Sequence, residues 1–163
     1  MRKFIIEDKR YIAPFNEPAR ELRILNKPLW LAQRDALTPY CETEATIDAP
    51  ESMSSDVQEA LVYRDNLYFD QPFIDEFIRL AKATGTACRA ACAADDKAFT
   101  TYAKLLAQGF EPGRSPDNKP IYLFDLWYFP RGYTANVVPI VVPSGWWEVG
   151  YYSVPSYMRS AET

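Results

Sequence analysis

The sequence predicts an α/β protein in which a mostly parallel sheet forms the middle of a three-layer core. Short apolar runs typical of strands alternate along the chain with segments whose apolar residues recur at helical spacing. Strands that alternate with helices tend to pair in parallel, because each helix carries the chain back across the sheet. The 163 residues show no internal repeat and are enough for one domain with its own core.

The amino-terminal third begins with a strand and continues into a helix. Residues 3–7 (KFIIE) are the first predicted strand, and prolines interrupt much of the polar segment after it. A helix is predicted from Pro28 to near Pro39, with Asn26 as its candidate cap. Residues 41–58 are acidic and contain Ser, Thr and Pro, which predicts a connecting loop.

The middle of the chain holds the clearest helix signal. Residues 60–64 (ALVYR) predict a second strand, after which Asp70 can cap a helix that ends at Gly85. The apolar residues of this helix recur at helical spacing: Phe73, Ile74, Phe77, Ile78 and Ala81.

The remaining chain predicts two strands, one helix and an extended segment. Residues 86–93 and 121–130 are apolar runs, and residues 95–109 begin at an acidic cap and end at a glycine. Residues 131–163 are rich in proline and aromatic side chains, which predicts edge strands or an extended aromatic arm.

Composition argues against several classes of protein. The net charge is −4 and no Lys/Arg cluster appears, so we expect no nucleic-acid binding. No apolar run is long enough to span a bilayer, so we expect no membrane insertion. Histidine is absent, which excludes a Ser-His-Asp triad and an imidazole metal site. Three cysteines without a secretion signal predict a reduced, cytoplasmic protein.

Three blocks, taken in order, carry a family resemblance: IIEDKRYIAPFNEPARELRILNKPLW, EALVYRDNLYFDQPFIDEFIRLAKATGTACRAA and LFDLWYFP. They resemble the N-terminal domain of sugar-phosphate nucleotidyltransferases related to the bifunctional N-acetylglucosamine-1-phosphate uridyltransferase/acetyltransferase. The resemblance implies an abbreviated nucleotidyltransferase-like (Rossmann-like) domain over residues 1–130. Residues 131–163 would then pack on this domain or lead to a downstream one.

The resemblance also implies a reaction, the transfer of a nucleotidyl group from a nucleoside triphosphate to a sugar 1-phosphate. Mg²⁺ would bridge the phosphates. Lys27 matches the phosphate-binding lysine of KPL-type motifs, and Arg20 and Arg23 would assist it in binding substrate. Asp65 would act in catalysis and, like Asp125, hold the metal. Asn66 would bind substrate.

One feature of active relatives is missing. They carry a glycine-rich loop with an arginine directly after the first strand, and this loop holds the triphosphate. Here the sequence is Glu7-Asp8-Lys9-Arg10-Tyr11, and the first glycine is Gly85. Acidic side chains repel a triphosphate, so the resemblance implies the fold more firmly than the activity.

Each candidate residue also has a purely structural interpretation. Lys27 followed by Pro28 is common at helix starts, and Asp65-Asn66 is a common turn sequence. Asp125 lies in an apolar strand and must be paired, bound to metal or exposed to water.

The densest aromatic patch, GWWEVGYY (145–152), suggests a function of another class. Its candidate interface residues are Trp146, Trp147, Tyr151 and Tyr152, which could dock a protein partner, build a homo-oligomer or simply cover the core. The alternative function is therefore a non-catalytic interaction or oligomerisation domain that keeps the fold.

Overall fold

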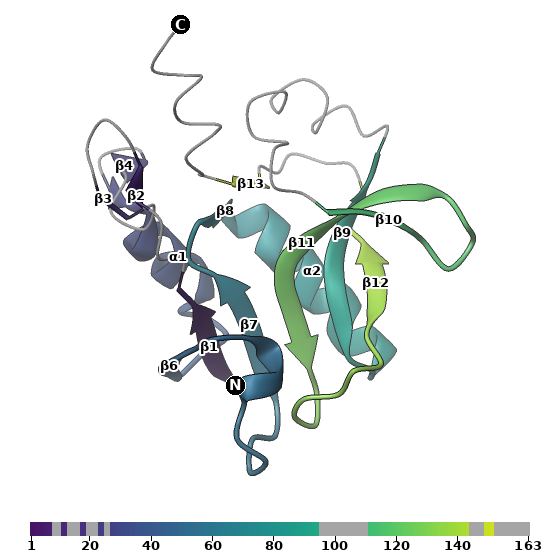
Figure 1. The fold of residues 1–163 in the computed structure, drawn as a ribbon, viewed down its shortest axis with the longest axis horizontal. Coiled ribbons are helices and arrows are strands. Elements are labelled where there is room, and N and C mark those ends of the chain that lie inside the picture. The colour runs from purple at the N-terminus through teal and green to yellow at the C-terminus, as the bar shows by residue number, and fades with distance from the viewer. Residues whose placement is uncertain are drawn as a thin grey trace, which may run out of the picture.

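The computed structural model describes residues 1–7, 11–12, 17–18, 23–24, 27–94, 111–143 and 149–151. Figure 1 shows how their strands and helices are arranged. In chain order the elements are β1 (Arg2–Ile6), β2 (Tyr11–Ile12), β3 (Glu17–Pro18), β4 (Arg23–Ile24), β5 (Lys27–Pro28), α1 (Leu29–Leu37), β6 (Thr43–Ile47), a 3₁₀ turn (Pro50–Ser52), β7 (Ala60–Arg64), β8 (Leu67–Phe69), α2 (Gln71–Thr84), β9 (Cys88–Ala93), β10 (Glu111–Arg114), β11 (Pro120–Phe129), β12 (Val138–Val141) and β13 (Val149–Tyr151). The predicted helix at 95–109 lies outside the described residues.

The main sheet of the described chain confirms the α/β class. Its strand order is β12-β9-β11-β7-β1-β6, with β10 paired to β11. Strand β1 pairs in parallel with both β6 and β7, and β9 pairs in parallel with β12. Strand β11 runs antiparallel to β7 and β9, so the sheet is mixed where a mostly parallel one was predicted.

A hairpin sets the direction of β11 relative to β10. Strands β10 and β11 pair antiparallel, with Arg114 opposite Pro120. Only a short turn joins them, and it includes Asn118 at a positive φ of 64°. A connection this short allows antiparallel pairing alone, because a parallel pair needs a crossover of a dozen residues or more. This hairpin lies in the stretch 111–120, which the sequence marked only as turns.

Strand β6 corrects the prediction of a loop at 41–58. It pairs with β1 along its whole length, from Arg2 opposite Thr43 to Ile6 opposite Ile47. Its side chains are exposed or half-buried. An edge strand whose side chains are little covered needs few apolar residues, so its sequence lacks the apolar run that marks a buried strand.

Helix α2 forms as predicted. Its cap is Asp70, whose Oδ1 accepts a hydrogen bond from the Phe73 amide at 3.1 Å, and it ends at Gly85 with φ 67°. The five apolar residues predicted for its inner face are all buried. Helix α1 also forms, but its N-cap is Pro28 rather than Asn26, and it has no side-chain cap.

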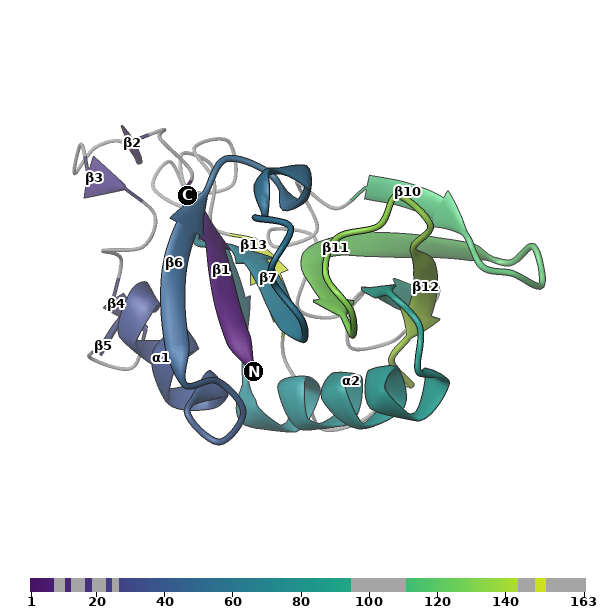
Figure 2. The ribbon, with the colours of Figure 1, turned by 90° about the horizontal axis from the view of Figure 1, so that it is seen from below.

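Both described helices cover the same face of the sheet. Leu37 of α1 and Phe77 of α2 belong to one buried cluster with Leu61 and Tyr63 of β7. Figure 2 shows α1 and α2 on one side of the strands. On the opposite face, Phe4 and Val62 pack in a second cluster with Met53 and Val57 of the segment 50–57. Among the described residues, the segment 50–57 covers this face of the sheet, where the three-layer prediction placed helices.

Gly132 forms a close backbone contact with the end of the segment that covers this face. The Gly132 amide donates a hydrogen bond to the Gln58 carbonyl at 2.7 Å, and its φ is 80°. A Cβ atom at this position would lie 2.7 Å from the Val57 carbonyl oxygen. Glycine is therefore required here for both its backbone angle and its lack of a side chain.

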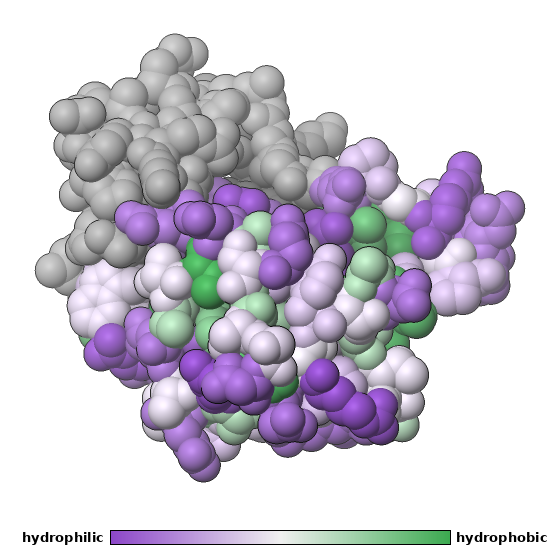
Figure 3. Space-filling view, turned by 60° about the horizontal axis from the view of Figure 1, so that its bottom comes forward, coloured by the Kyte–Doolittle hydropathy of each residue, from purple (hydrophilic) through white to green (hydrophobic). Residues whose placement is uncertain are grey.

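The surface of the described residues is mainly polar. Figure 3 shows one face on which hydrophilic side chains predominate and hydrophobic ones form small separate patches. Two large hydrophobic side chains of the described residues, Tyr133 and Val138, are each 42% exposed. Neither described helix has the length and apolar character needed to cross a membrane.

Candidate binding site under helix α1

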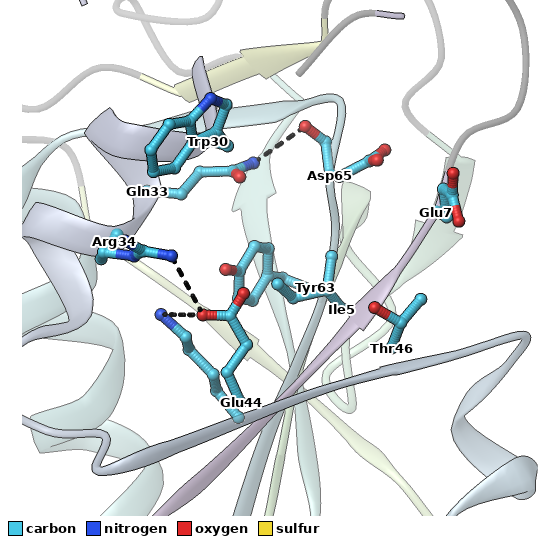
Figure 4. A pocket seen from close by; sticks show the side chains of 10 residues that line it. Ile5, Glu7, Trp30, Gln33, Arg34, Glu44, Thr46, Tyr63 and Asp65 are labelled. Atoms are coloured by element: carbon cyan, nitrogen blue, oxygen red, sulfur yellow. Dashed lines mark hydrogen bonds and ion pairs between the residues drawn. The ribbon is translucent and has the colours of Figure 1, made fainter. Parts of the chain in front are cut away.

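A pocket of about 290 Å³ lies between helix α1 and the edge of the sheet formed by β6, β1 and β7. Figure 4 shows its side chains. The described residues that line it are Lys3, Ile5, Glu7, Trp30, Gln33, Arg34, Glu44, Thr46, Tyr63 and Asp65. Five of these carry a formal charge, so the pocket is polar although it lies on the same face of the sheet as the larger apolar core.

Strand register explains why these side chains meet. Alternate residues of a strand point to the same face, so Lys3, Ile5 and Glu7 all face α1. Parallel pairing places Glu44 beside Lys3, and it places Thr46 and Tyr63 on either side of Ile5. The pocket floor is therefore built in rows across three strands.

The helix closes the pocket from above. Trp30, Gln33 and Arg34 lie three and four positions apart, which puts them on one side of α1. The Arg34 guanidinium lies over the Trp30 ring, 4.8 Å from its centroid, a cation–π contact between two residues that line the pocket. Gln33 is 1% exposed, and its Nε2 donates to the carbonyls of Asp65 at 3.0 Å and Leu67 at 2.8 Å.

Glu7 and Asp65 form what we call the outer end of the pocket, at the carboxyl ends of β1 and β7. The Asp65 amide donates a hydrogen bond to the Ile6 carbonyl at 2.9 Å, and Asp65 itself is 3% exposed. The next residue, Asn66, is 2% exposed, and no hydrogen bond from the described chain reaches its Oδ1. A turn rich in buried oxygen atoms therefore stands where open α/β sheets bind ligands.

Lys3, Arg34 and Glu44 form the inner end. The Lys3 ammonium lies 3.6 Å and the Arg34 guanidinium 3.7 Å from the same oxygen, Oε2 of Glu44. Tyr63 lies between the two ends and is 1% exposed. Burial above all, followed by the charge of Glu44, raises the pKa of the Tyr63 hydroxyl, which keeps this group a neutral hydrogen-bond donor.

The structure locates some of the residues predicted from the sequence. Asp65 lines the pocket, and Asn66 is buried beside it. Lys27 lies in β5, directly before the helix that roofs the pocket, and Arg23 lies opposite Pro28 in β4. The side chains of Lys27 and Arg23, and all of Arg20, lie outside what the structure describes. Their predicted roles therefore stay predictions.

Asp125 is not brought together with Asp65. It lies on the opposite face of the sheet, between two arginines. Its Oδ2 accepts a hydrogen bond from Arg64 Nε at 2.9 Å, and its Oδ1 accepts one from Arg89 NH2 at 2.9 Å. Ion pairing with two arginines accounts for a carboxylate in an apolar strand, and the predicted metal-binding role of Asp125 stays a prediction.

The aromatic arm is described in part. Strand β13 pairs antiparallel with β8, so that Tyr151 lies opposite Leu67, close in sequence to the Asp65-Asn66 turn. Trp146, Trp147 and Tyr152 lie outside the described residues, as does the Tyr151 side chain.

The sequence prediction missed the inner end. Lys3, Arg34 and Glu44 are single charges on three separate elements, and each is ordinary for an exposed surface. One signal was available: Lys3 occupies an inward-facing position of β1, in alternation with Phe4 and Ile6 on the other face.

The donor set at the outer end is compatible with Mg²⁺ that is shared with a phosphate. Magnesium is commonly held by one or two carboxylates together with phosphate oxygens. Asp65 and Glu7 supply carboxylates, and the Asn66 Oδ1 is a buried acceptor beside them. The described residues contain no group of three or more Asp, Glu or Cys side chains that would hold a metal by themselves. The fit is therefore to a metal that a ligand helps to hold.

Comparison with known proteins identifies the fold. No protein family model and no curated protein sequence matches the chain. Among solved structures, HddC from Yersinia pseudotuberculosis complexed with GMP-PN matches with a TM-score of 0.53 and 8% identity. A second structure of HddC matches with a TM-score of 0.52 and 10% identity, and in both cases 99% of each chain is covered. The chain shares the α/β fold of these HddC structures over 99% of its length. At this level of identity, the likeness concerns the fold alone.

Proposed function

We propose that this chain is a sugar-phosphate nucleotidyltransferase-like domain that binds a nucleotide at the outer end of the pocket. The observation that carries the proposal is the position of Asp65. This buried carboxylate follows β7, faces the pocket and lies beside the end of β1. The fold is shared with HddC, which has been crystallised with GMP-PN. That complex supports a nucleotide as the ligand.

Asp65 would hold Mg²⁺ together with the phosphates, and Glu7 lies close enough in the pocket to assist. The metal would supply neutralisation of the phosphate charge. Gln33 keeps the Asp65-Asn66 turn in place through its two hydrogen bonds. Lys27, with Arg20 and Arg23, would bind the phosphates. The reaction would move a nucleotidyl group from a nucleoside triphosphate to a sugar 1-phosphate, in the cytoplasm.

The charge of the outer end makes this proposal testable. Glu7 and Asp65 are both acidic, and no cation lines that end among the described residues. A triphosphate alone is repelled there, whereas a Mg²⁺-triphosphate carries a cation for the carboxylates to bind. Nucleotide binding must therefore depend on the divalent cation.

The test is thermal denaturation with a panel of nucleoside triphosphates, with and without Mg²⁺. A triphosphate at a hundredfold excess over its Kd should stabilise the fold by about 2.7 kcal/mol. For a chain of this length, that raises Tm by about 5–10 °C. The shift should need Mg²⁺ and should disappear in Asp65→Asn.

Asp117→Asn is the matched control, because the Asp117 side chain is 61% exposed and pairs with Lys119 far from the pocket. The control should keep the full shift. An unchanged Tm with every triphosphate, or a shift that Asp65→Asn retains, would contradict the proposal. Release of pyrophosphate in the presence of a sugar 1-phosphate then tests for transfer itself.

A second function is favoured by one observation, the absence of glycine before Gly85. Without a glycine-rich loop the chain lacks the usual means of holding a triphosphate. A domain that kept the fold without the activity would act as a partner-docking or oligomerisation domain through Trp146, Trp147, Tyr151 and Tyr152. Replacing both tryptophans by alanine should then change the mass measured by analytical ultracentrifugation. An unchanged mass and intact partner binding would count against this function.

A further inference from the structure

The inner end of the pocket contains a largely buried lysine whose ammonium group has one charged partner among the described residues. The Lys3 side chain is 8% exposed. Its one carboxylate neighbour in the described chain is Glu44, at 3.6 Å, and it donates no hydrogen bond within that part of the protein. An ammonium group has three hydrogen-bond donors, so the Lys3 ammonium can still donate to oxygen atoms that enter the pocket.

Arg34 adds a second cation at the same place. Its guanidinium approaches Oε2 of Glu44, the oxygen that Lys3 also approaches, at 3.7 Å. Neither distance is short enough for a hydrogen bond. Two positive charges thus share one negative charge, and the inner end keeps a surplus of one positive charge. The contact with Trp30 holds the guanidinium over the pocket.

Neutral groups complete the site. Figure 4 shows the Tyr63 hydroxyl pointing toward the end of the pocket where Arg34 and Glu44 lie. The two hydrogen bonds of Gln33 use both hydrogens of its Nε2, which leaves its Oε1 as an acceptor for a hydroxyl group. The pocket therefore offers donors for an anion at one place and an acceptor for a neutral ligand group nearby.

We propose that the inner end binds the phosphate of a small phosphate monoester, with Lys3, Arg34 and Tyr63 as its donors. Ammonium and guanidinium groups together are a common pair of phosphate ligands in proteins. A volume of about 290 Å³ is many times the roughly 10–15 Å³ that one water needs, so it has room for a phosphate on a sugar ring.

This site is distinct from the one proposed for the nucleotide. Lys3 and Glu7 are four residues apart on a strand, about 13 Å along its axis. The phosphate site uses neither Asp65 nor Mg²⁺, so its existence does not depend on the proposed function.

The experiment is calorimetric titration of the full chain in EDTA with inorganic phosphate, glucose 1-phosphate and glucose. We expect both phosphates to bind and glucose to bind far more weakly. Lys3→Met keeps an apolar side chain of similar length and should weaken phosphate binding about tenfold or more. Lys119→Met, at a lysine whose side chain is 76% exposed, removes the same charge and should change nothing.

A second variant, expected to tighten phosphate binding rather than weaken it, excludes a folding defect as the cause of the change. Glu44→Gln removes the carboxylate that competes with phosphate for both cations, so it should tighten binding several-fold. Damage to the fold cannot produce that result. Asp65→Asn should bind phosphate as the unaltered chain does, which separates this site from the nucleotide site.

Four results would overturn the proposal. They are absence of phosphate binding, glucose binding as tight as that of its phosphate, equal weakening by Lys3→Met and Lys119→Met, and loss of affinity in Glu44→Gln. A stronger signal for glucose 1-phosphate than for inorganic phosphate would assign the ligand as an ester, and equal signals would assign it as free phosphate. Either of these results supports the phosphate site at the inner end of the pocket.

Discussion

Two clusters in this molecule place one carboxylate between two cations, and they differ in how completely the groups are paired. On one face of the sheet, Asp125 uses each of its oxygens for a 2.9 Å hydrogen bond, to Arg64 and to Arg89. Arg89 also donates to the Phe124 carbonyl at 2.7 Å and to Glu111 at 2.7 Å. On the other face, Lys3 and Arg34 share one oxygen of Glu44 at 3.6 and 3.7 Å.

The difference separates a structural cluster from a binding one. The Asp125 cluster satisfies its own charges, and Arg89 in addition stacks on Trp127, 4.8 Å from the ring centroid. It has little left to offer a ligand. The Glu44 cluster keeps donors and a surplus charge that face a pocket. One carboxylate with two cations therefore stabilises the fold around Asp125, whereas the same combination of charges around Glu44 leaves donors for a ligand.

The largest effect should come from Asp125→Ala. This substitution leaves two half-buried arginines without their shared carboxylate, and we expect it to lower the free energy of unfolding by about 2–3 kcal/mol. Urea denaturation measures the change. Phosphate binding by the folded fraction should stay unchanged, since the site lies on the other face. A loss below about 0.5 kcal/mol would contradict the structural role.

A paired comparison of arginines should give the next effect. Arg89→Met removes hydrogen bonds to Phe124, Asp125 and Glu111, and should cost about 2 kcal/mol of stability. Arg34→Met removes an exposed guanidinium whose nearest carboxylate is 3.7 Å away, and should cost about 0.5 kcal/mol or less. The same two variants should rank in the opposite order for phosphate affinity. Equal stability losses would remove the distinction between the clusters.

Lys3→Met should leave stability unchanged or raise it by up to about 1 kcal/mol. Replacing a buried, weakly paired charge by an apolar side chain of similar shape removes a desolvation cost that its single 3.6 Å contact does not offset. Thermal and urea denaturation should agree. A clear loss of stability would show that the ammonium supports the fold, and would weaken the case for a ligand.

The smallest effect concerns alkaline pH. Burial raises the pKa of Tyr63 above its ordinary value of 10.0, so the folded chain retains a proton that the unfolded chain releases. The stabilisation is complete below pH 10 and is lost as the pH rises further. Tyr63→Phe should reduce the fall in stability between pH 8 and about pH 11. Part of the fall should persist, because the pKa of Tyr40 is also raised, to about 12, by burial and by its hydrogen bond to Asp75.

How much the sequence predicted depended on whether a signal was local. Helix α2 has its cap, its apolar spacing and its stop within sixteen consecutive residues, from Asp70 to Gly85, and all three were predictable. The position of Asp65 at the end of a strand was predictable because it directly follows an apolar run, and the structure shows that it lines the pocket. Strand β6 was missed because an exposed edge strand needs no apolar run.

The pairings of charged residues were not predictable, because they join distant parts of the chain. Asp125 and Arg89 are 36 residues apart, and Asp125 and Arg64 are 61 apart. Nothing near Asp125 in the sequence distinguishes an arginine partner from a metal. Lys3, Arg34 and Glu44 likewise meet only because β6 takes the position beside β1.

Gly132 has a consequence for finding relatives of this protein. The Val57 carbonyl oxygen lies where a side chain at position 132 would begin. We therefore expect Gly132 to be retained in any relative that keeps the segment at 50–58 in the same place. The HddC structures share 8% and 10% of their residues with this chain, too few to align two sequences by their letters alone. A position fixed by geometry is a landmark that survives such divergence. Searches for distant homologues can weight it above the many apolar positions that exchange freely.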